Sequence, residues 1–401
     1  MKKIIYISFP FSSHINPQIN LCKAFSDKNV EQIFYTSQSF FSKFDGVNNI
    51  ELRKYPETFE KKFKKLAEEN KDTVIKEFRV FALMYYFYLF ADELIQFLID
   101  EIGKEKPSVI ICDPFAIWGK MVAKYFNIPL INFYIGILGD ALDSKDFKKA
   151  MIRSLVLDIP EMIKLVKLKN GIDKKYGNIT EHPKQFLLHQ GYFSIVPTSR
   201  EFHPGGENYG DNIKFIGPAH VEDCEIPKNK NKIFIAMGTF SSSDTIWDKC
   251  IEATKDLGYE VVVSFGGSSG NSVNISNLPE NVKIFDNLAL DEYREVLKHS
   301  VLFICHGGFN SINDSILYMT PMLVCPNTAE QKSNGILIEE LGCGMLYEDK
   351  KFEIDNIRKK AIAVINNDNL KIGLEKYRKS FINSMGYKNL VLEINKEFNI
   401  F

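Results

Sequence analysis

Short hydrophobic runs alternate along the chain with segments whose apolar residues recur at helical spacing. The runs are typical of strands buried on both faces, and the periodic segments are typical of helices that cover a sheet. This alternation predicts an α/β chain with parallel sheets. The predicted strands are residues 1–9, 31–37, 107–112, 130–134, 193–196 and 213–216 in the first half, and 233–237, 260–265, 282–285, 301–305 and 321–326 in the second.

A polar segment separates the two halves. Residues 217–231 begin with Gly-Pro and continue through acidic residues into an alternation of lysine and asparagine, which is typical of a linker. We therefore predict a first domain at 1–216, a linker at 217–231, a second domain at 232–380 and a terminal helix at 381–401. A chain of 401 residues, 45% of them hydrophobic, is long enough for two separate cores.

Charge and cysteine content exclude several classes of protein. The net charge of -1 gives no electrostatic basis for binding nucleic acid. The seven cysteines form no CxxC pair, and several lie in strand-like runs, which indicates buried free thiols and a cytoplasmic protein. No spacing of histidines, cysteines or carboxylates predicts a metal site.

The candidate chemistry is concentrated between Val301 and Glu340. The strand 301–305 stops at His306-Gly307-Gly308, and a helix is predicted to follow through Asn310 and Ser311. Unpaired N–H groups and a partial positive charge make such a helix N-terminus suitable for a diphosphate. An ordinary βα turn is the alternative for the two glycines alone. A second strand at βαβ distance, followed by Glu330 and Gln331, favours the binding site.

This block resembles the donor-binding signature of the family-one UDP-glycosyltransferases, especially the bacterial macrolide and antibiotic transferases. The resemblance implies the GT-B fold, in which two Rossmann-like parallel-sheet domains face each other across a cleft. It also implies that the turn His306, Gly307, Gly308, Asn310 and Ser311 holds the diphosphate of a sugar donor. Glu330 and Gln331 would bind the sugar hydroxyls by this resemblance. A helix-start acidic pair with an exposed glutamine is the alternative for these two residues.

Two residues of the first half match the catalytic positions of the same family. His14 follows the first predicted strand within Phe9-Pro10-Phe11-Ser12-Ser13-His14, and a helix is predicted from about Asn16 to Asp27. The resemblance makes His14 the general base for the acceptor hydroxyl, because a neutral imidazole accepts a proton near working pH. Asp113 ends the strand 107–112 and would orient that base. The alternatives are a histidine that caps the helix and a turn-forming or N-capping aspartate.

The remaining donor contacts are expected at two places. Gly238, Thr239 and Ser241 follow the first strand of the second half, where family members approach the diphosphate. The usual Pro-Gln pair and stacking tryptophan for the nucleobase are missing after residues 282–285. Phe285 or Leu288 would contact the nucleobase instead.

An aromatic cluster lies in the helical region 58–102. Its charged residues argue against a stable membrane insertion. A core helix is the favoured interpretation, with an apolar wall for an acceptor and a membrane-docking face as alternatives. The cluster consists of Phe78, Phe81, Tyr85, Tyr86, Phe87, Tyr88 and Phe90.

Together, the resemblance implies an inverting, metal-independent transferase without a cofactor. It would move a sugar from a UDP- or dTDP-sugar to a hydroxyl of a small, largely apolar acceptor such as a natural product. A nucleotide-sugar epimerase on the same fold, or a noncatalytic nucleotide-sugar-binding helper of a partner transferase, is the alternative. A homodimer is compatible with the sequence.

Overall fold

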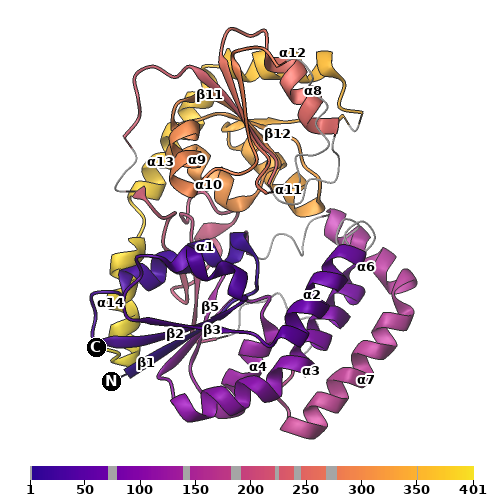
Figure 1. The fold of residues 1–401 in the computed structure, drawn as a ribbon, viewed down its shortest axis with the longest axis vertical. Coiled ribbons are helices and arrows are strands. Elements are labelled where there is room, and N and C mark those ends of the chain that lie inside the picture. Colours follow the sequence, from indigo (N-terminus) through magenta and orange to yellow (C-terminus); the bar gives the residue numbers. More distant parts are fainter. Residues whose placement is uncertain are drawn as a thin grey trace. The chain divides into compact units, whose positions relative to one another are not determined.

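The computed structural model describes residues 2–70, 79–138, 145–181, 191–221, 225–238, 245–267, 278–349 and 351–401. The chain divides into two compact units (Figure 1). Unit 1 comprises residues 1–219 together with 384–401, and unit 2 comprises residues 220–383. Each unit has its own parallel sheet, as the alternation of strands and helices predicts.

Unit 1 is built on a seven-stranded sheet among the described residues, in the order β3-β2-β1-β4-β5-β6-β7. All neighbouring strands are parallel. Because both faces are covered by helices, the central strands are apolar at nearly every position. The strands are β1 (Lys2–Ile7), β2 (Val30–Thr36), β3 (Ile50–Lys54), β4 (Val109–Cys112), β5 (Leu130–Phe133), β6 (Phe193–Val196) and β7 (Ile213–Phe215).

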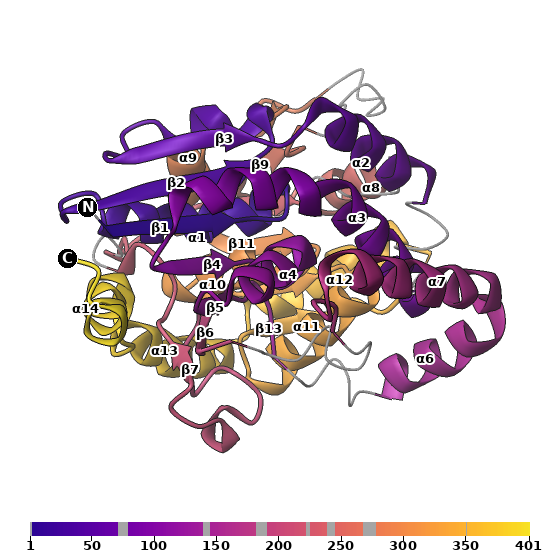
Figure 2. The same ribbon diagram turned by 90° about the horizontal axis from the view of Figure 1, so that it is seen from below.

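Successive strand residues of unit 1 point into two different cores. Ile5 and Ile7 belong to one cluster with helices α3, α4 and α7, whereas Ile4 and Tyr6 belong to the other with α1 and α14 (Figure 2). The helices are α1 (Ser12–Ala24), α2 (Glu57–Glu69), α3 (Val80–Glu105), α4 (Ile117–Phe126), α6 (Lys145–Leu157), α7 (Ile159–Tyr176) and α14 (Gly386–Phe398). Among the described residues of this unit, short 3-10 helices span Gln38–Phe44 and Gly206–Asn208.

Helix α3 is the one helix of the described residues that is long and apolar enough to cross a membrane by length and composition. It packs instead among α4, α7 and the sheet, and Tyr88 and Phe90 are buried in that core. The core-helix interpretation of the aromatic cluster is confirmed for these two residues. Phe78 lies outside the described residues. The helical region predicted at 58–102 is divided between α2 and α3.

Unit 2 has a six-stranded parallel sheet among its described residues, in the order β10-β9-β8-β11-β12-β13. Its strands are β8 (Lys232–Ala236), β9 (Glu260–Ser264), β10 (Val282–Phe285), β11 (Ser300–Cys305), β12 (Met322–Val324) and β13 (Gly344–Leu346). Its helices are α8 (Thr245–Thr254), α9 (Leu290–Lys298), α10 (Phe309–Leu317), α11 (Ala329–Glu340), α12 (Ile354–Ile365) and α13 (Asn369–Ile382).

A lysine from the predicted linker holds the carboxyl end of α10. The Lys230 ammonium donates to the carbonyl oxygens of Tyr318 and Met319 at 2.7 and 2.9 Å and to the Thr320 hydroxyl at 2.8 Å. A cation here satisfies carbonyl groups that have no partner within the helix and complements the helix dipole. Lys230 therefore fixes the helix whose opposite end follows the glycine turn.

Candidate functional site

In unit 1 the fold brings His14 and Asp113 together across 99 positions of sequence. The Nδ1 atom of His14 lies 2.6 Å from Oδ2 of Asp113. An ionised carboxylate only accepts hydrogen bonds, so Nδ1 of a neutral His14 carries the proton and Nε2 keeps its lone pair. The Asp113 side chain is fully buried, whereas that of His14 is 17% exposed. This pair can remove a proton from a hydroxyl that reaches Nε2.

The turn after β4 fixes the Asp113 carboxylate. The Oδ1 atom accepts a hydrogen bond from the backbone N–H of Phe115 at 2.9 Å. The backbone carbonyl of Asp113 accepts one from the N–H of Ala116 at 2.9 Å. The other oxygen is left for His14. Asp113 is therefore both a turn former and the partner of His14, so the two interpretations of its sequence context are compatible.

Helix α1 carries His14 in its first turn. The helix begins at Ser12 rather than at Asn16, and the predicted start is wrong. Pro17 consequently lies at the sixth position of the helix, past the first turn, where proline has no N–H to donate along the helix. The N-cap is Phe11, with no side-chain cap. The alternative that His14 caps this helix is therefore wrong.

Aromatic rings surround the His14 imidazole. The rings of Phe9, Phe11 and Phe115 have centroids 5.5, 6.2 and 5.4 Å from it. Phe87 of α3 packs on Phe115 at 5.7 Å. Phe115 is 37% exposed. One residue of the aromatic cluster on α3 thus contributes to an apolar surface beside His14.

In unit 2 the glycine turn is packed around the His306 ring. The turn joins β11 to α10, and Gly308 is the N-cap of that helix. A Cβ atom on Gly308 would lie 2.6 Å from His306 Nε2, and one on Gly238 would lie 2.6 Å from Cε1. Gly238 also has a φ of +70°, which disfavours other residues. These two glycines let the carboxyl ends of β8 and β11 enclose the imidazole.

Burial determines the charge of His306. Desolvation lowers its pKa to about 4, and the carbonyl of Ala236 offsets part of this shift. His306 is therefore neutral near pH 7 and carries a single N–H, which can donate either to the Ala236 carbonyl or to a diphosphate. The first turn of α10, which contains Asn310 and Ser311, has no acidic residue. Positive charge at this site then comes from the helix N-terminus rather than from the imidazole.

The start of α11 lies against the same turn. The amide of Asn334 donates to the carbonyl of Gly307 at 2.9 Å and lies 3.5 Å from the Glu330 carboxylate. The Gln331 side-chain oxygen accepts from the N–H groups of Asn327 and Thr328 at 2.8 and 3.2 Å, as part of a capping box. Gln331 is buried, so the interpretation of an exposed glutamine is wrong. Its oxygen is already used, and only its amide N–H groups remain for a sugar.

The structure describes only some of the other residues that are expected to contact the donor. Phe285 ends β10 and is exposed, and Leu288 follows it half-buried. In the sheet order, β10 is separated from β11 by β9 and β8, so Phe285 stands apart from the glycine turn. Thr239 and Ser241 lie outside the described residues.

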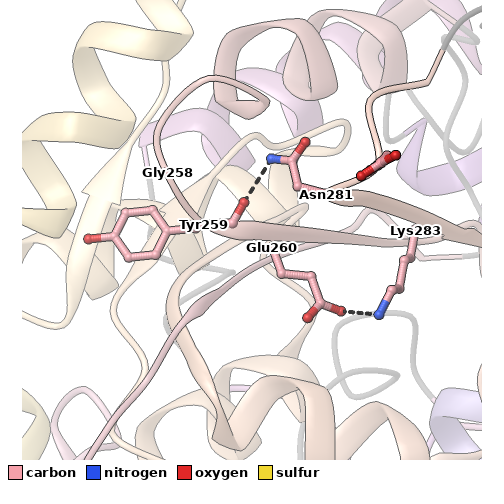
Figure 3. Close-up of a pocket in the computed structure, with 6 residues that line it drawn as sticks. Gly258, Tyr259, Glu260, Asn281 and Lys283 are labelled. Atoms are coloured by element: carbon pink, nitrogen blue, oxygen red, sulfur yellow. Dashed lines mark hydrogen bonds and ion pairs between the residues drawn. The ribbon is translucent and has the colours of Figure 1, made fainter.

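A surface depression in unit 2 lies away from this chemistry (Figure 3). It is formed at the amino ends of β9 and β10, whereas the glycine turn lies at the carboxyl end of β11. Its side chains bond to one another: Lys283 pairs with Glu260 at 3.0 Å, and Asn281 donates to the Tyr259 carbonyl at 2.9 Å. Ligands of parallel sheets bind at the carboxyl ends of strands, so we assign no function to this depression. The described residues contain no cluster suited to a metal ion.

Comparison with known proteins identifies proteins that this chain resembles. Residues 248–385 match the C-terminal domain of proteins like the erythromycin biosynthesis protein CIII. The chain is 24% identical over 375 residues to an uncharacterized UDP-glucosyltransferase, YojK, of Bacillus subtilis, covering 92% of this chain and 90% of the relative. It is 20% identical over 387 residues to the demethyllactenocin mycarosyltransferase of Streptomyces fradiae, covering 94% and 82%.

Solved structures give the same result for the fold. The calicheamicin glycosyltransferase CalG4 superposes with a TM-score of 0.81 at 17% identity, covering 100% of this chain and 98% of CalG4. The glycosyltransferase VinC, solved with dTDP, superposes with a TM-score of 0.71 at 15% identity, covering 99% of both chains. The chain is similar along most of its length to glycosyltransferases, and its fold is the GT-B fold. These similarities favour neither the epimerase nor the helper alternative.

Two groups of residues in this glycosyltransferase-like chain were not anticipated from the sequence. Phe11 and Phe115 flank the candidate base, and their signal was only their nearness to His14 and Asp113. Asn334 ties α11 to the glycine turn, and its signal was its spacing of one helical turn from Glu330. Both groups became recognisable once the side-chain contacts were known.

Proposed function

We propose that this protein is an inverting glycosyltransferase that moves a sugar from a UDP- or dTDP-sugar to a hydroxyl of a small, largely apolar acceptor. The observation that carries the proposal is the 2.6 Å contact between His14 and Asp113. It orients the imidazole so that Nδ1 meets the carboxylate and Nε2 is left to accept a proton, which is the requirement for a general base. The similarity to glycosyltransferases along most of the chain supports the reaction class.

In the proposed reaction, Nε2 of His14 takes the proton of the acceptor hydroxyl. The hydroxyl oxygen forms a bond to the anomeric carbon while the bond from that carbon to the diphosphate oxygen breaks, and the leaving diphosphate keeps the electron pair. Attack from the face opposite the leaving group inverts the anomeric centre. Asp113 stabilises the imidazolium that forms. The aromatic rings beside His14 would contact an apolar acceptor.

Charge develops on the leaving diphosphate, and unit 2 offers groups that stabilise it. The N-terminus of α10 supplies N–H groups and a partial positive charge, and the neutral His306 supplies a hydrogen bond. Asn310, Ser311 and Gly238 would complete this diphosphate site, with Glu330 and the Gln331 amide on the sugar hydroxyls. These groups would serve in place of a divalent cation.

The test is His14→Ala, assayed with a panel of UDP- and dTDP-sugars and apolar acceptors bearing hydroxyls. We expect turnover to fall by about 100-fold or more, the usual effect of losing a general base, while UDP or dTDP affinity stays the same. His299→Ala is the matched control, because His299 is a half-buried histidine at the C-cap of α9 in unit 2. NMR of the product should show the inverted anomer. Full turnover by His14→Ala, or a product that retains configuration, would contradict the proposal.

A further inference from the structure

Helices α6 and α7 present large apolar side chains to solvent. Of the nineteen exposed large hydrophobic residues in the described part of the chain, seven lie between positions 152 and 166. Monomeric soluble proteins rarely expose contiguous apolar patches of this kind unless another surface covers them. The seven are Ile152, Leu155, Val156, Leu157, Ile159, Ile163 and Val166, which are 46–68% exposed. We call them the α6–α7 apolar surface.

The apolar residues form a stripe along each helix. Ile159, Ile163 and Val166 follow the i, i+4, i+7 spacing of one helical face. The other face of α7 is already used, because Leu165 and Ile172 are buried in the core of unit 1 against α3. The stripe is therefore a second apolar face, beyond the one that the fold needs.

Buried polar contacts hold this surface in a defined position. The Ser154 hydroxyl accepts from the N–H of Val80 at 2.9 Å. The Asp158 carboxylate, at the junction of α6 and α7, is fully buried and accepts from the Arg79 guanidinium and from the N–H of Ala82. The two helices are thus anchored to the start of α3, and their exposed stripes are displayed by an ordered scaffold.

The charge around the stripes is positive. Residues 145–176 contain nine lysines and arginines and four acidic residues, in a chain whose net charge is -1. Two of the acidic residues are neutralised within the fold: Asp158 by Arg79, and Asp173 by Lys169 at 2.9 Å. Arg153 and Lys167 are exposed beside the stripes. Cations therefore outnumber acidic residues along these two helices.

We propose that the α6–α7 apolar surface docks reversibly on an anionic lipid bilayer. Apolar residues bordered by lysine and arginine are the pattern of helices that lie in a membrane interface, where side chains enter the acyl boundary and cations meet phosphate head groups. The basic border argues for this occupant over a second copy of the chain, whose matching surface would carry the same charge. Docking leaves α3 in the core and does not require any helix to span the bilayer.

The experiment is flotation of the full chain with vesicles of equal parts phosphatidylglycerol and phosphatidylcholine. We expect the wild type to float at low salt, less at high salt, and little with phosphatidylcholine alone. The double variant Val156→Glu, Ile163→Glu should lose binding by about tenfold or more, because two exposed apolar residues become anionic. Ile372→Glu is the matched control: Ile372 is 67% exposed on α13 and should leave flotation unchanged.

Three results would overturn the proposal. They are no flotation of the wild type with anionic vesicles, equal flotation of the double variant, and a dimer that light scattering detects in the wild type but not in the double variant. The last would show that a second copy covers the surface. Circular dichroism checks that the variants are folded. The measurement uses no sugar donor, so its outcome is independent of the proposed glycosyl transfer.

Discussion

At the scale of single residues, the candidate diphosphate site depends on glycines, which have no side chain to fill the space beside His306. The His306 ring is held between Gly238 and Gly308, at distances that leave no room for a Cβ atom. Gly307 contributes in a different way, because its φ of +86° and the nearby Val324 side chain both exclude a larger residue. The three glycines position the imidazole and let the backbone approach an anion closely.

Gly308→Ala tests this dependence. Its φ of -67° suits any residue, so the expected effect is steric: the methyl group must displace His306. We expect UDP or dTDP affinity, measured by calorimetry, to fall by about tenfold or more, which is the loss of one good hydrogen bond. Gly136→Ala is the control, since a Cβ there meets nothing within 4 Å. Unchanged affinity in Gly308→Ala would remove His306 from the diphosphate site.

At the scale of elements, the connections after strands are fixed by side chains from distant loops. His203, between β6 and β7, accepts a hydrogen bond at Nε2 from the N–H of Leu138, which follows β5, at 2.7 Å. Its Nδ1 atom donates to the Pro204 carbonyl at 2.8 Å. A neutral ring is needed for this pair of bonds, and burial lowers the pKa of His203 to about 4.

Acid should therefore weaken unit 1 through His203. The folded pKa lies below the unfolded value of about 6.5, so the unfolded state takes up a proton first as the pH falls. The stability is fully present above pH 6.5 and is lost as the pH falls toward 4, by about 3 kcal/mol. Urea unfolding near pH 7.5 and pH 4.5 should show that His203→Gln loses part of this dependence. His299→Gln should keep the wild-type pH dependence of the unfolding free energy. An equal pH dependence in the two variants would contradict the role of His203.

At the scale of the whole molecule, the chain completes unit 1 only after it has built unit 2. Helix α14 packs against α1, and its buried Leu390, Val391 and Ile394 join the core beneath β1 and β4. The Lys214–Glu393 ion pair at 2.9 Å and the bond from Tyr192 to Glu397 add contacts near the edge strands. The last residues of the chain are therefore part of the first fold unit.

Leu390→Ala measures this contribution. Removing a fully buried leucine leaves a cavity, and we expect the unfolding free energy of unit 1 to fall by about 3 kcal/mol. Leu392→Ala on the same helix is the control, because Leu392 is 56% exposed and should change stability by less than about 0.5 kcal/mol. Hydrogen exchange resolved by unit should show the loss in the strands of unit 1. A loss confined to unit 2 would contradict the packing of α14.

Most strands were predictable because their signal is local. The long apolar runs of β1, β4, β8 and β11 are strands in the structure, and their parallel order agrees with the predicted α/β class. The edge strands β3 and β13 were missed. β3 reads Ile-Glu-Leu-Arg-Lys, with charged residues on an exposed edge, and β13 is three residues long and begins with glycine. Each is defined by pairing with one neighbour, which no local pattern records.

The sequence by itself determined the alternation of strands and helices, the glycine turn after β11 and the position of His14 after β1, because each depends on neighbouring residues. Only the tertiary structure decided which groups far apart in the sequence bond to or pack against one another. It shows the contact between His14 and Asp113 that the resemblance implies, and it occupies the side-chain oxygen of Gln331 within a cap, which the sequence did not indicate. It also buries Tyr88 and Phe90 of α3 while leaving seven large apolar residues of α6 and α7 exposed. Burial of an apolar residue depends on what else packs against it, which the sequence of its own helix does not record.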